Sequence, residues 1–363
     1  MVSYERKFCC YDLNLGCKKL KSSCVKNPLK VSCCQDGISM ARILVTGGGG
    51  FVGSHLAKNL YKQGNFVRTA DVKYDNYIQE EYCTEKLTLD LRYLDNCIKA
   101  TKNIDKVYNL AANMGGIGFI TEVGAEVMHD NTLINTFMLE AARQNKVRRY
   151  LFTSSACVYP TYRQTDPNVK GLREEDAYPA DPDNFYGWEK LYTEKMCEAY
   201  QRDYNMDIRI LRYHNIYGPE GTYKGGREKS PAALCRKVAE TKNPGTIEIW
   251  GDGKQTRSYC YVDDAVKATT LLMESDYDKP INIGSDRLVT INKLADIIID
   301  VSGKKIAKTY NPTAPQGVRG RNAELTLVKK VLNWQPQITL EQGLSNTYRW
   351  IEQQVYNDKK IHA

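Results

Sequence analysis

Short apolar runs alternate with stretches of helical spacing from residue 41 to about residue 215. The runs have the length and the β-branched or aromatic content of buried strands, and they lie at 41–46, 66–71, 87–91, 106–112, 150–154 and 208–212. Helical periods fall between them, most clearly at 54–60, about 125–144 and about 186–204. Because strands that alternate with helices are typical of a parallel sheet covered on both faces, we predict an α/β fold with a doubly wound parallel sheet.

Beyond residue 215 the pattern breaks into shorter elements. It predicts helices at 230–241, from 263, near 291–301 and at about 340–356, and strands at 247–250, 258–262 and 280–283. We therefore expect a first domain at 41–215 and a smaller α/β domain at 216–357, with part of 247–283 returning to the first sheet. Residues 358–363 are expected to be a short tail.

The first 40 residues show neither period, and we predict a basic, disordered extension there. Six of the 12 cysteines lie in it without a CxxC pair or a histidine, so no metal site is expected. No signal-peptide pattern is present, and the other six cysteines are scattered singly, which is typical of reduced thiols in the cytoplasm. Met40 would make a natural start for the globular part.

Composition narrows the classes of function. With 42% hydrophobic and 26% charged residues, the chain resembles a soluble globular protein, and no apolar run is long enough to span a membrane. The net charge of +8 fits a protein that handles phosphates. No basic patch interleaved with aromatic residues is present, so nucleic-acid binding is not expected.

A glycine-rich turn joins the first predicted strand to the first predicted helix. Such a turn lets the backbone approach a pyrophosphate, which the N–H groups of the helix terminus then bind. Its expected cofactor-binding residues are Gly47, Gly50, Phe51, Val52 and Gly53. Asp71 ends the second strand, where a carboxylate would bind the adenosine ribose and favour NAD over NADP, and Asp90 is expected near the adenine. We therefore predict an NAD-binding Rossmann domain.

A tyrosine and a lysine four positions apart open the helix near residue 186. Tyr186 and Lys190 share one helix face, where the charges of the lysine and of an oxidised nicotinamide would stabilise the phenolate. Tyr186 would then take a proton from a substrate hydroxyl that Ser154 or Ser155 also binds. Taken alone, the pair is also compatible with an ordinary helix start, and the nearby Cys157 with a buried small hydrophobe.

Long motifs carry a resemblance to a known family. The segments TGGGGFVG and GDGKQTRSYCYVDD, the SSxxxYP strand end and the Tyr186–Lys190 pair resemble extended short-chain dehydrogenases/reductases that act on nucleotide sugars. Further segments resemble, more specifically, the GDP-mannose 3,5-epimerases of the NAD-dependent epimerase/dehydratase family. These segments are NMGGIGF, SSACVYP, RYHNIYGPEGTYKGGREKSPAALCRK, IWGDGKQTRS and GVRGRN. The resemblance covers about residues 41 to 357.

The resemblance implies roles for individual residues. Cys157 and Lys229 match a catalytic acid–base pair, and Tyr186 and Lys190 match the pair that oxidises the sugar. The other positions that match the nucleotide-sugar site are Gly115, Ser155, Ala156, Asn215, Glu228, Lys237, Gln255, Arg257 and Arg319. The resemblance also implies a GDP-sugar substrate and a homodimer formed through the helices at 125–144 and 186–204.

The chemistry of these residue types agrees with that reaction. Oxidation of a sugar at C4 makes the protons on C3 and C5 acidic, and inversion needs one group to remove a proton and another to return one on the opposite face. A thiolate and an ammonium suit the task, because neighbours can tune both. The alternatives are a nucleotide-sugar 4-epimerase or 4,6-dehydratase, which need only the Tyr/Lys pair, and a non-catalytic NAD-sensing protein.

Overall fold

The computed structural model describes residues 40–361, apart from residues 75, 76 and 79. The predicted extension before Met40 and the last two residues lie outside the described residues. The contacts group the chain from Met40 onward in one compact unit, so the division at residue 215 stays a prediction. Within the described part, none of the helices combines the length and the apolar character of a membrane span.

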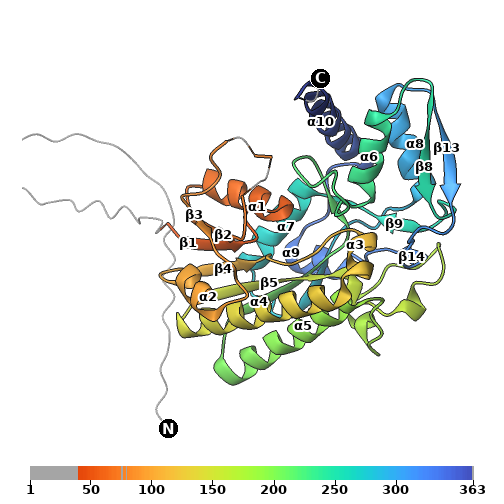
Figure 1. The fold of residues 1–363 in the computed structure, drawn as a ribbon. Coiled ribbons are helices and arrows are strands. Elements are labelled where there is room, and N and C mark those ends of the chain that lie inside the picture. The colour runs from red at the N-terminus through yellow and green to blue at the C-terminus, as the bar shows by residue number, and fades with distance from the viewer. Residues whose placement is uncertain (1–39, 75–76, 79, 362–363) are drawn as a thin grey trace, which may run out of the picture. The chain divides into compact units, whose positions relative to one another are not determined.

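Seven strands form the main sheet, in the order β11-β6-β5-β4-β1-β2-β3, and every neighbouring pair is parallel (Figure 1). They are β1 (Arg42–Thr46), β2 (Phe66–Asp71), β3 (Glu85–Thr88), β4 (Lys106–Asn109), β5 (Arg149–Ser155), β6 (Ile208–Tyr213) and β11 (Pro280–Ile283). The strand order reverses between β1 and β4, the point at which such sheets bind ligands beyond their carboxyl ends. The predicted doubly wound sheet is confirmed.

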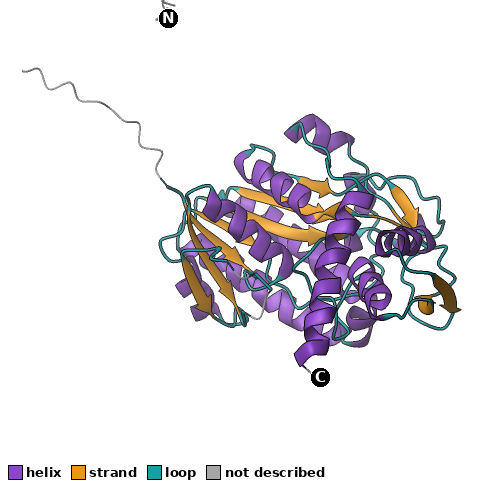
Figure 2. Cartoon of the chain, turned by 90° about the horizontal axis from the view of Figure 1, so that it is seen from above, coloured by secondary structure: helices purple, strands orange, loops and turns teal. Residues whose placement is uncertain are grey.

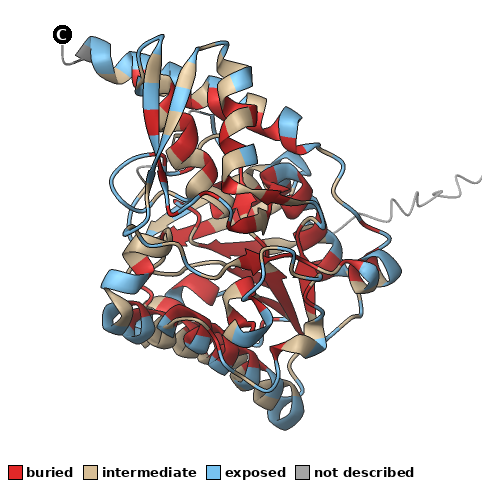
Figure 3. Cartoon of the chain, turned by 90° about the vertical axis from the view of Figure 1, so that its right-hand side faces the viewer, coloured by how far each residue is buried: buried red, intermediate tan, exposed pale blue. Residues whose placement is uncertain are grey.

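Helices cover both faces of this sheet (Figures 1 and 2). One face carries α1 (Phe51–Lys62) and α7 (Val262–Glu274), and the other carries α2 (Leu94–Thr101), α4 (Gly124–Gln144) and α5 (Phe185–Tyr204). Because successive strand residues point to opposite faces, Ile43 and Val45 join the core under α1 and α7, whereas Leu44 joins the core under α4. Figure 3 shows that buried residues line much of the strands in this sheet.

Most of the chain beyond residue 215 forms smaller sheets and their covering helices. The helices are α6 (Ser230–Glu240), α8 (Ile291–Ser302), α9 (Thr326–Leu332) and α10 (Leu340–Ile361). The small sheets pair β7 (Ile216–Tyr217) with β10 (Cys260–Tyr261), β8 (Gly245–Trp250) with β13 (Ile306–Asn311), and β9 (Thr256–Ser258) with both β12 (Leu288–Thr290) and β14 (Gly320–Arg321). From this part of the chain, β11 returns to the main sheet beside β6.

Two predicted strand ends are wrong by a few residues. The third strand is β3 at Glu85–Thr88 rather than 87–91, and its register places Arg68 opposite Glu85, whose carboxylate lies 2.7 Å from the arginine Nε. The fourth strand ends at Asn109 rather than 112, because the N–H groups of Leu110 and Ala111 donate to Thr46 Oγ1 at 3.0 and 3.1 Å. The chain therefore leaves the main sheet earlier than predicted at both β3 and β4.

Two later elements also differ from prediction. The expected strand at 258–262 is divided between β9 and β10, because Asn215 binds the Ser258 carbonyl and accepts the Cys260 N–H across the break. The final helix continues to Ile361, so residues 358–361 are helical rather than a tail. The Asp358 carboxylate there accepts hydrogen bonds from the Tyr223 hydroxyl at 2.8 Å and Lys224 Nζ at 2.6 Å.

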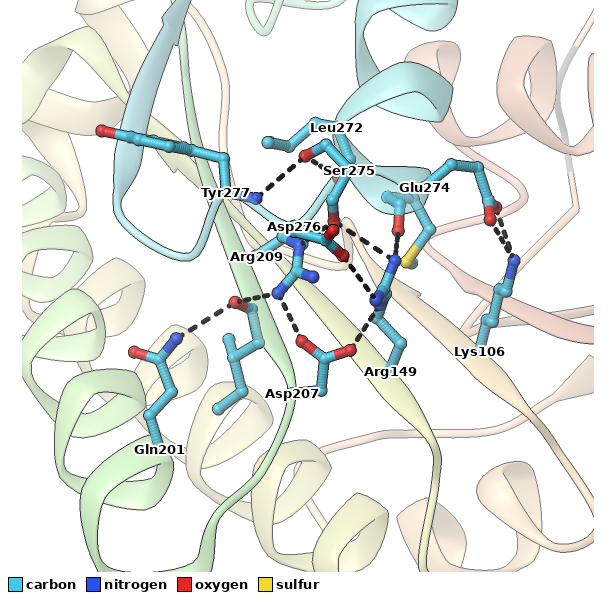
Figure 4. A network of polar contacts seen from close by, with 12 residues as sticks. Lys106, Arg149, Gln201, Asp207, Arg209, Leu272, Glu274, Ser275, Asp276 and Tyr277 are labelled. Atoms are coloured by element: carbon cyan, nitrogen blue, oxygen red, sulfur yellow. Dashed lines mark hydrogen bonds and ion pairs between the residues drawn. The ribbon is translucent and has the colours of Figure 1, made fainter. Parts of the chain in front are cut away.

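A charged network lies at the amino end of the main sheet, opposite the carboxyl ends of the strands (Figure 4). Arg209 in β6 donates to Asp207 at 2.5 Å and to the Ser275 carbonyl at 2.8 Å. Arg149 in β5 donates to the same carboxylate at 2.5 Å and to the Met273 carbonyl at 2.7 Å. These cations satisfy backbone carbonyls at the carboxyl end of α7, which is the negative end of its dipole. The network therefore ties α7 to two central strands.

Arg209→Met is expected to lower the free energy of unfolding by about 1–3 kcal/mol, because the Ser275 carbonyl and one Asp207 oxygen lose a largely buried donor. Urea unfolding followed by circular dichroism measures the change. Arg202→Met is the matched control: Arg202 is exposed and pairs with Asp203, so its loss should change stability by less than about 0.5 kcal/mol. Equal losses in both variants would contradict the role given to the network.

Candidate active site

The glycine turn forms a backbone cradle beyond the carboxyl end of β1. Gly47 has a φ of +68°, and a Cβ on Gly53 would lie 2.0 Å from the Gly47 carbonyl oxygen, so neither position accepts a side chain without strain. Gly50 is the N-cap of α1, whose first turn has no side-chain cap and no acidic residue. Phe51 and Val52 are half-buried and pack against the core. The turn fits a pyrophosphate, because it offers helix N–H groups and the first turn of α1 contains no acidic residue.

The two predicted cofactor acids lie in different surroundings. Asp71 ends β2, and its carboxylate accepts hydrogen bonds from the N–H groups of Gly49 at 2.9 Å and Val72 at 2.7 Å, which hold it at the edge of the cradle. Asp90 lies beyond β3 and pairs with Arg92 at 2.7 Å, and this hydrogen bond lowers the pKa of Asp90. The role of Asp90 beside an adenine stays a prediction.

The predicted oxidation pair lies at the start of α5. Tyr186 is buried and its hydroxyl lies near the Ser155 side chain. Burial raises the pKa of Tyr186 well above its ordinary value, and the negative charges of Cys157 and Glu189 add to the effect. Lys190 Nζ lies 5.5 Å from the centre of the tyrosine ring, and burial lowers the pKa of Lys190 although Glu189 opposes this. The protein alone therefore favours the neutral phenol.

The structure distinguishes the two serines that end β5. Ser154 is buried and donates to Glu194 at 2.5 Å, and the same carboxylate binds Arg212 at 2.6 Å. Ser155 instead lies near the Tyr186 hydroxyl. This arrangement favours Ser155 over Ser154, and the role of Ser155 toward a substrate hydroxyl stays a prediction.

Cys157 lies in a single 3-10 turn directly after β5. Its N–H donates to Ser155 Oγ at 3.2 Å, and its carbonyl contacts the first turn of α5 so closely that a Cβ on Gly187 would lie 2.2 Å from it. Cys157 is half-buried, whereas the other cysteines in the described part of the chain are buried. The thiol is thus held beside the oxidation pair and is accessible to a substrate.

Lys229 immediately precedes α6 and faces the same site. A Cβ on Gly116 would lie 2.5 Å from the Glu228 carbonyl oxygen, and the Gly116 N–H donates to the Arg227 carbonyl at 3.0 Å, so the second glycine loop supports the lysine segment. Lys229 is exposed by its surface area, while burial of its amine lowers the pKa of Lys229 and the negative charge of Cys157 opposes this shift. The two predicted acid–base groups therefore lie within electrostatic reach of each other.

Arg257 lies near this centre. Its guanidinium donates to the Thr256 carbonyl at 2.7 Å, and burial together with the charge of Arg321 lowers the pKa of Arg257 to about 10. The charge of Cys157 acts on it in the opposite direction. An arginine that is crowded by a second cation is well suited to bind an anionic substrate.

The other predicted substrate residues mostly bind protein groups. The pairs are Lys237 with the Glu248 carbonyl (2.7 Å), Arg319 with Asp252 (2.9 and 3.0 Å), Glu228 with Arg236 (3.1 Å) and Asn215 with the Ser258 carbonyl (2.9 Å). Ala156 is buried, and a Cβ on Gly115 would meet the Phe119 side chain at the start of α3 (Ile117–Glu122). Gln255 leaves its buried Oε1 without a hydrogen-bond partner among the described residues, as a ligand-binding amide would. These substrate roles stay predictions.

Sequence reasoning missed the residue that contacts the Cys157 sulfur. Arg321 Nη1 donates to Cys157 Sγ at 3.3 Å. This arginine lies two positions beyond Arg319 in the GVRGRN motif, so the motif contained the signal, but nothing in the spacing showed which arginine turns inward.

A scan against protein-family models matches residues 43–284 to the NAD dependent epimerase/dehydratase family. The chain belongs to this family. The GDP-mannose 3,5-epimerase 1 of Oryza sativa subsp. indica is 47% identical over 319 residues, which cover 88% of this chain and 83% of that protein. The GDP-mannose 3,5-epimerase of Arabidopsis thaliana is 45% identical over 319 residues and covers 88% of this chain and 84% of its own length. The resemblance predicted from the motifs is confirmed.

The fold of this epimerase/dehydratase family member is also found among solved structures. The UDP-glucose 4-epimerase of Thermotoga maritima, solved with UDP-glucose, superposes with a TM-score of 0.78 at 27% identity. It covers 86% of this chain and 99% of its own. The likeness therefore extends through the elements beyond residue 215 as well as the main sheet.

Proposed function

We propose that this chain epimerises GDP-mannose at C3 and C5, towards GDP-L-galactose and GDP-L-gulose, with tightly bound NAD. Two relatives at 45–47% identity carry the name of this activity, and the glycine cradle fits the pyrophosphate of the cofactor. The glycine turn and Asp71 would hold NAD, which would supply the hydride chemistry at C4.

Tyr186 and Ser155 act on the hydroxyl at C4. Ser155 hydrogen-bonds the hydroxyl while Tyr186 accepts its proton, and the same proton returns when the ketone is reduced. Because burial and nearby negative charge raise the pKa of Tyr186, the phenolate needs added positive charge. Lys190 and the oxidised nicotinamide ring provide that charge, which confines proton removal to the complex with oxidised cofactor.

The placement of Cys157 and Lys229 carries the proposal. They lie far apart in the sequence, yet the charge of one acts on the other beside Tyr186. Once C4 is a ketone, one of them removes the proton from C3 or C5 and the other returns a proton to the opposite face of the ring. Enzymes that only invert C4 have no use for such a pair.

The phosphate end of the substrate meets a cationic surface in this proposal. Arg257, Lys237 and Arg319 would bind the GDP diphosphate, and the buried Gln255 amide would take a polar group of the substrate. The protein partners of Lys237 and Arg319 would then be exchanged for phosphate oxygens. Such an exchange fits side chains that are only partly buried.

We extend the proposal to a cytoplasmic homodimer formed through α4 and α5. Exposed apolar side chains on these helices support it: Phe185 and Trp188 on α5 and Met128 on α4 are 58%, 42% and 37% exposed. Large apolar groups gathered on two adjacent helices favour burial against a second copy. Sedimentation of the purified protein measures the mass of the assembly.

Incubation with GDP-mannose in heavy water is expected to place deuterium at C3 and C5, because the ketone at C4 makes both protons exchangeable with solvent. Nuclear magnetic resonance of the recovered sugar nucleotide measures the label and the configuration at each carbon. Boiled protein is the control for chemical exchange. Inversion at C4 without label at C3 or C5 would replace the proposal with a 4-epimerase, and loss of water from the sugar would indicate a 4,6-dehydratase.

A further inference from the structure

Arg321 uses three of its nitrogens around the sulfur of Cys157. Nη1 donates to Cys157 Sγ at 3.3 Å, Nη2 pairs with Asp183 at 3.0 Å, and Nε donates to Gln164 Oε1 at 2.6 Å. The residue is 6% exposed. Because three nitrogens of this buried guanidinium each bind a protein group, the side chain cannot rotate away without breaking all three contacts.

These contacts join segments that carry different parts of the site. Asp183 lies just before α5, the helix of Tyr186, and Cys157 lies in the turn that packs against Gly187 in that helix. Arg321 itself comes from β14, which pairs with the β9 strand of Arg257. One side chain therefore connects the thiol, the oxidation helix and the small sheet on the substrate side.

A positive charge lies beside the sulfur of Cys157, because Arg321 donates to it. Burial opposes the positive charge of the guanidinium, yet the pKa of Arg321 lies above its ordinary value because the negative charges of Cys157 and Asp183 outweigh burial. A hydrogen bond from a guanidinium to a thiolate is charge-assisted and stronger than one to a thiol. The thiolate is the form of cysteine that reacts and that accepts protons.

We propose that Arg321 is a positioning residue, which holds Cys157 as a thiolate at a fixed place relative to Tyr186. Its effect on turnover rests on the proposed epimerase function, whereas its effect on the thiol does not. Arg321 donates to the sulfur, so it acts through Cys157. Two readouts, one with substrate and one without, therefore separate the two ideas.

The test compares the NAD-loaded wild type with Arg321→Gln, which keeps hydrogen-bonding groups but removes the charge. Iodoacetamide at neutral pH is expected to alkylate Cys157 about tenfold more slowly in the variant, as loss of a charge-assisted hydrogen bond predicts. Peptide mass spectrometry resolves Cys157 from the other cysteines. Deuterium wash-in should fall with the alkylation rate, while oxidation at C4, followed by fluorescence of the reduced cofactor, is retained. Arg287→Gln, at an exposed pair with Glu341, is the control and should leave both rates unchanged.

Arg321→Lys keeps the charge with fewer bonds, and it carries the test if Arg321→Gln does not fold. We expect its alkylation rate to lie between those of the wild type and the uncharged variant. A purely structural role would loosen the turn and expose the thiol, so unchanged or faster alkylation would overturn the inference. Slower alkylation in an enzyme whose wild type shows no wash-in would support the inference and reject the proposed epimerase function.

Discussion

Cys157→Ser is expected to reduce deuterium wash-in and epimerisation by roughly 10³-fold, the size of a lost acid–base group. The pKa of a serine hydroxyl is so high that the group stays protonated at neutral pH. Serine therefore cannot remove the sugar proton in place of a cysteine thiolate. The cofactor should stay bound, because Cys157 lies outside the glycine cradle and its backbone contacts with Ser155 and Gly187 remain. Nuclear magnetic resonance measures wash-in, and extraction of the purified variant measures bound NAD.

In Cys157→Ser, we expect oxidation at C4 to continue while deuterium wash-in at C3 and C5 is lost. Tyr186 and Ser155 are intact, so incubation with GDP-mannose should still produce fluorescence of the reduced cofactor. Cys83→Ser is a matched control, since this buried residue accepts a hydrogen bond from Thr69 that a serine can also accept. Wash-in at the wild-type rate in Cys157→Ser would remove Cys157 from the acid–base chemistry.

Tyr186→Phe is expected to abolish both steps, with a loss of turnover of roughly 10²–10⁴-fold. Phenylalanine fills the same buried volume but has no hydroxyl to exchange a proton with O4, so C4 is not oxidised. Without the ketone, the protons on C3 and C5 are not acidic, and wash-in should vanish although Cys157 and Lys229 are present. Stopped-flow fluorescence of the reduced cofactor, together with the wash-in assay, measures both steps.

The control for this change is Tyr204→Phe, at the far end of the same helix, where the side chain is 54% exposed. It should retain full turnover. The order of events makes the comparison between the two active-site variants informative, because loss of oxidation stops exchange whereas loss of the thiol does not stop oxidation. Wash-in that persists in Tyr186→Phe would mean that exchange proceeds without a ketone at C4, which contradicts the proposed reaction.

The periodic parts of this fold are predictable because their signals are local. The run of β1, the glycines at Gly47 and Gly53 and the acid at Asp71 follow one another in the order that a nucleotide-binding βαβ unit requires. Strand ends are less predictable, as β4 shows: the chain leaves the sheet early because Thr46 on a neighbouring strand accepts two of its N–H groups. Such a partner is not visible in the apolar pattern.

The site could be predicted only in part for a related reason. The sequence left open whether Ser154 or Ser155 binds the substrate. The choice depends on Glu194, which lies forty residues later and binds Ser154. The link between Cys157 and Lys229 came from a resemblance, since no period connects a turn after a strand with a glycine-rich loop. Arg321 was missed because its direction depends on the sheet that β14 joins.

The last turn of α10 holds the loop that precedes Lys229. Asp358 binds Tyr223 and Lys224, which open the loop that leads to Lys229. The loop is therefore clamped at one side by the C-terminal helix and at the other by the glycine loop at Gly116. For protein engineering, this means that a tag or truncation at the C-terminal helix would act on the mobility of Lys229, the proposed acid–base lysine, while leaving the main sheet intact.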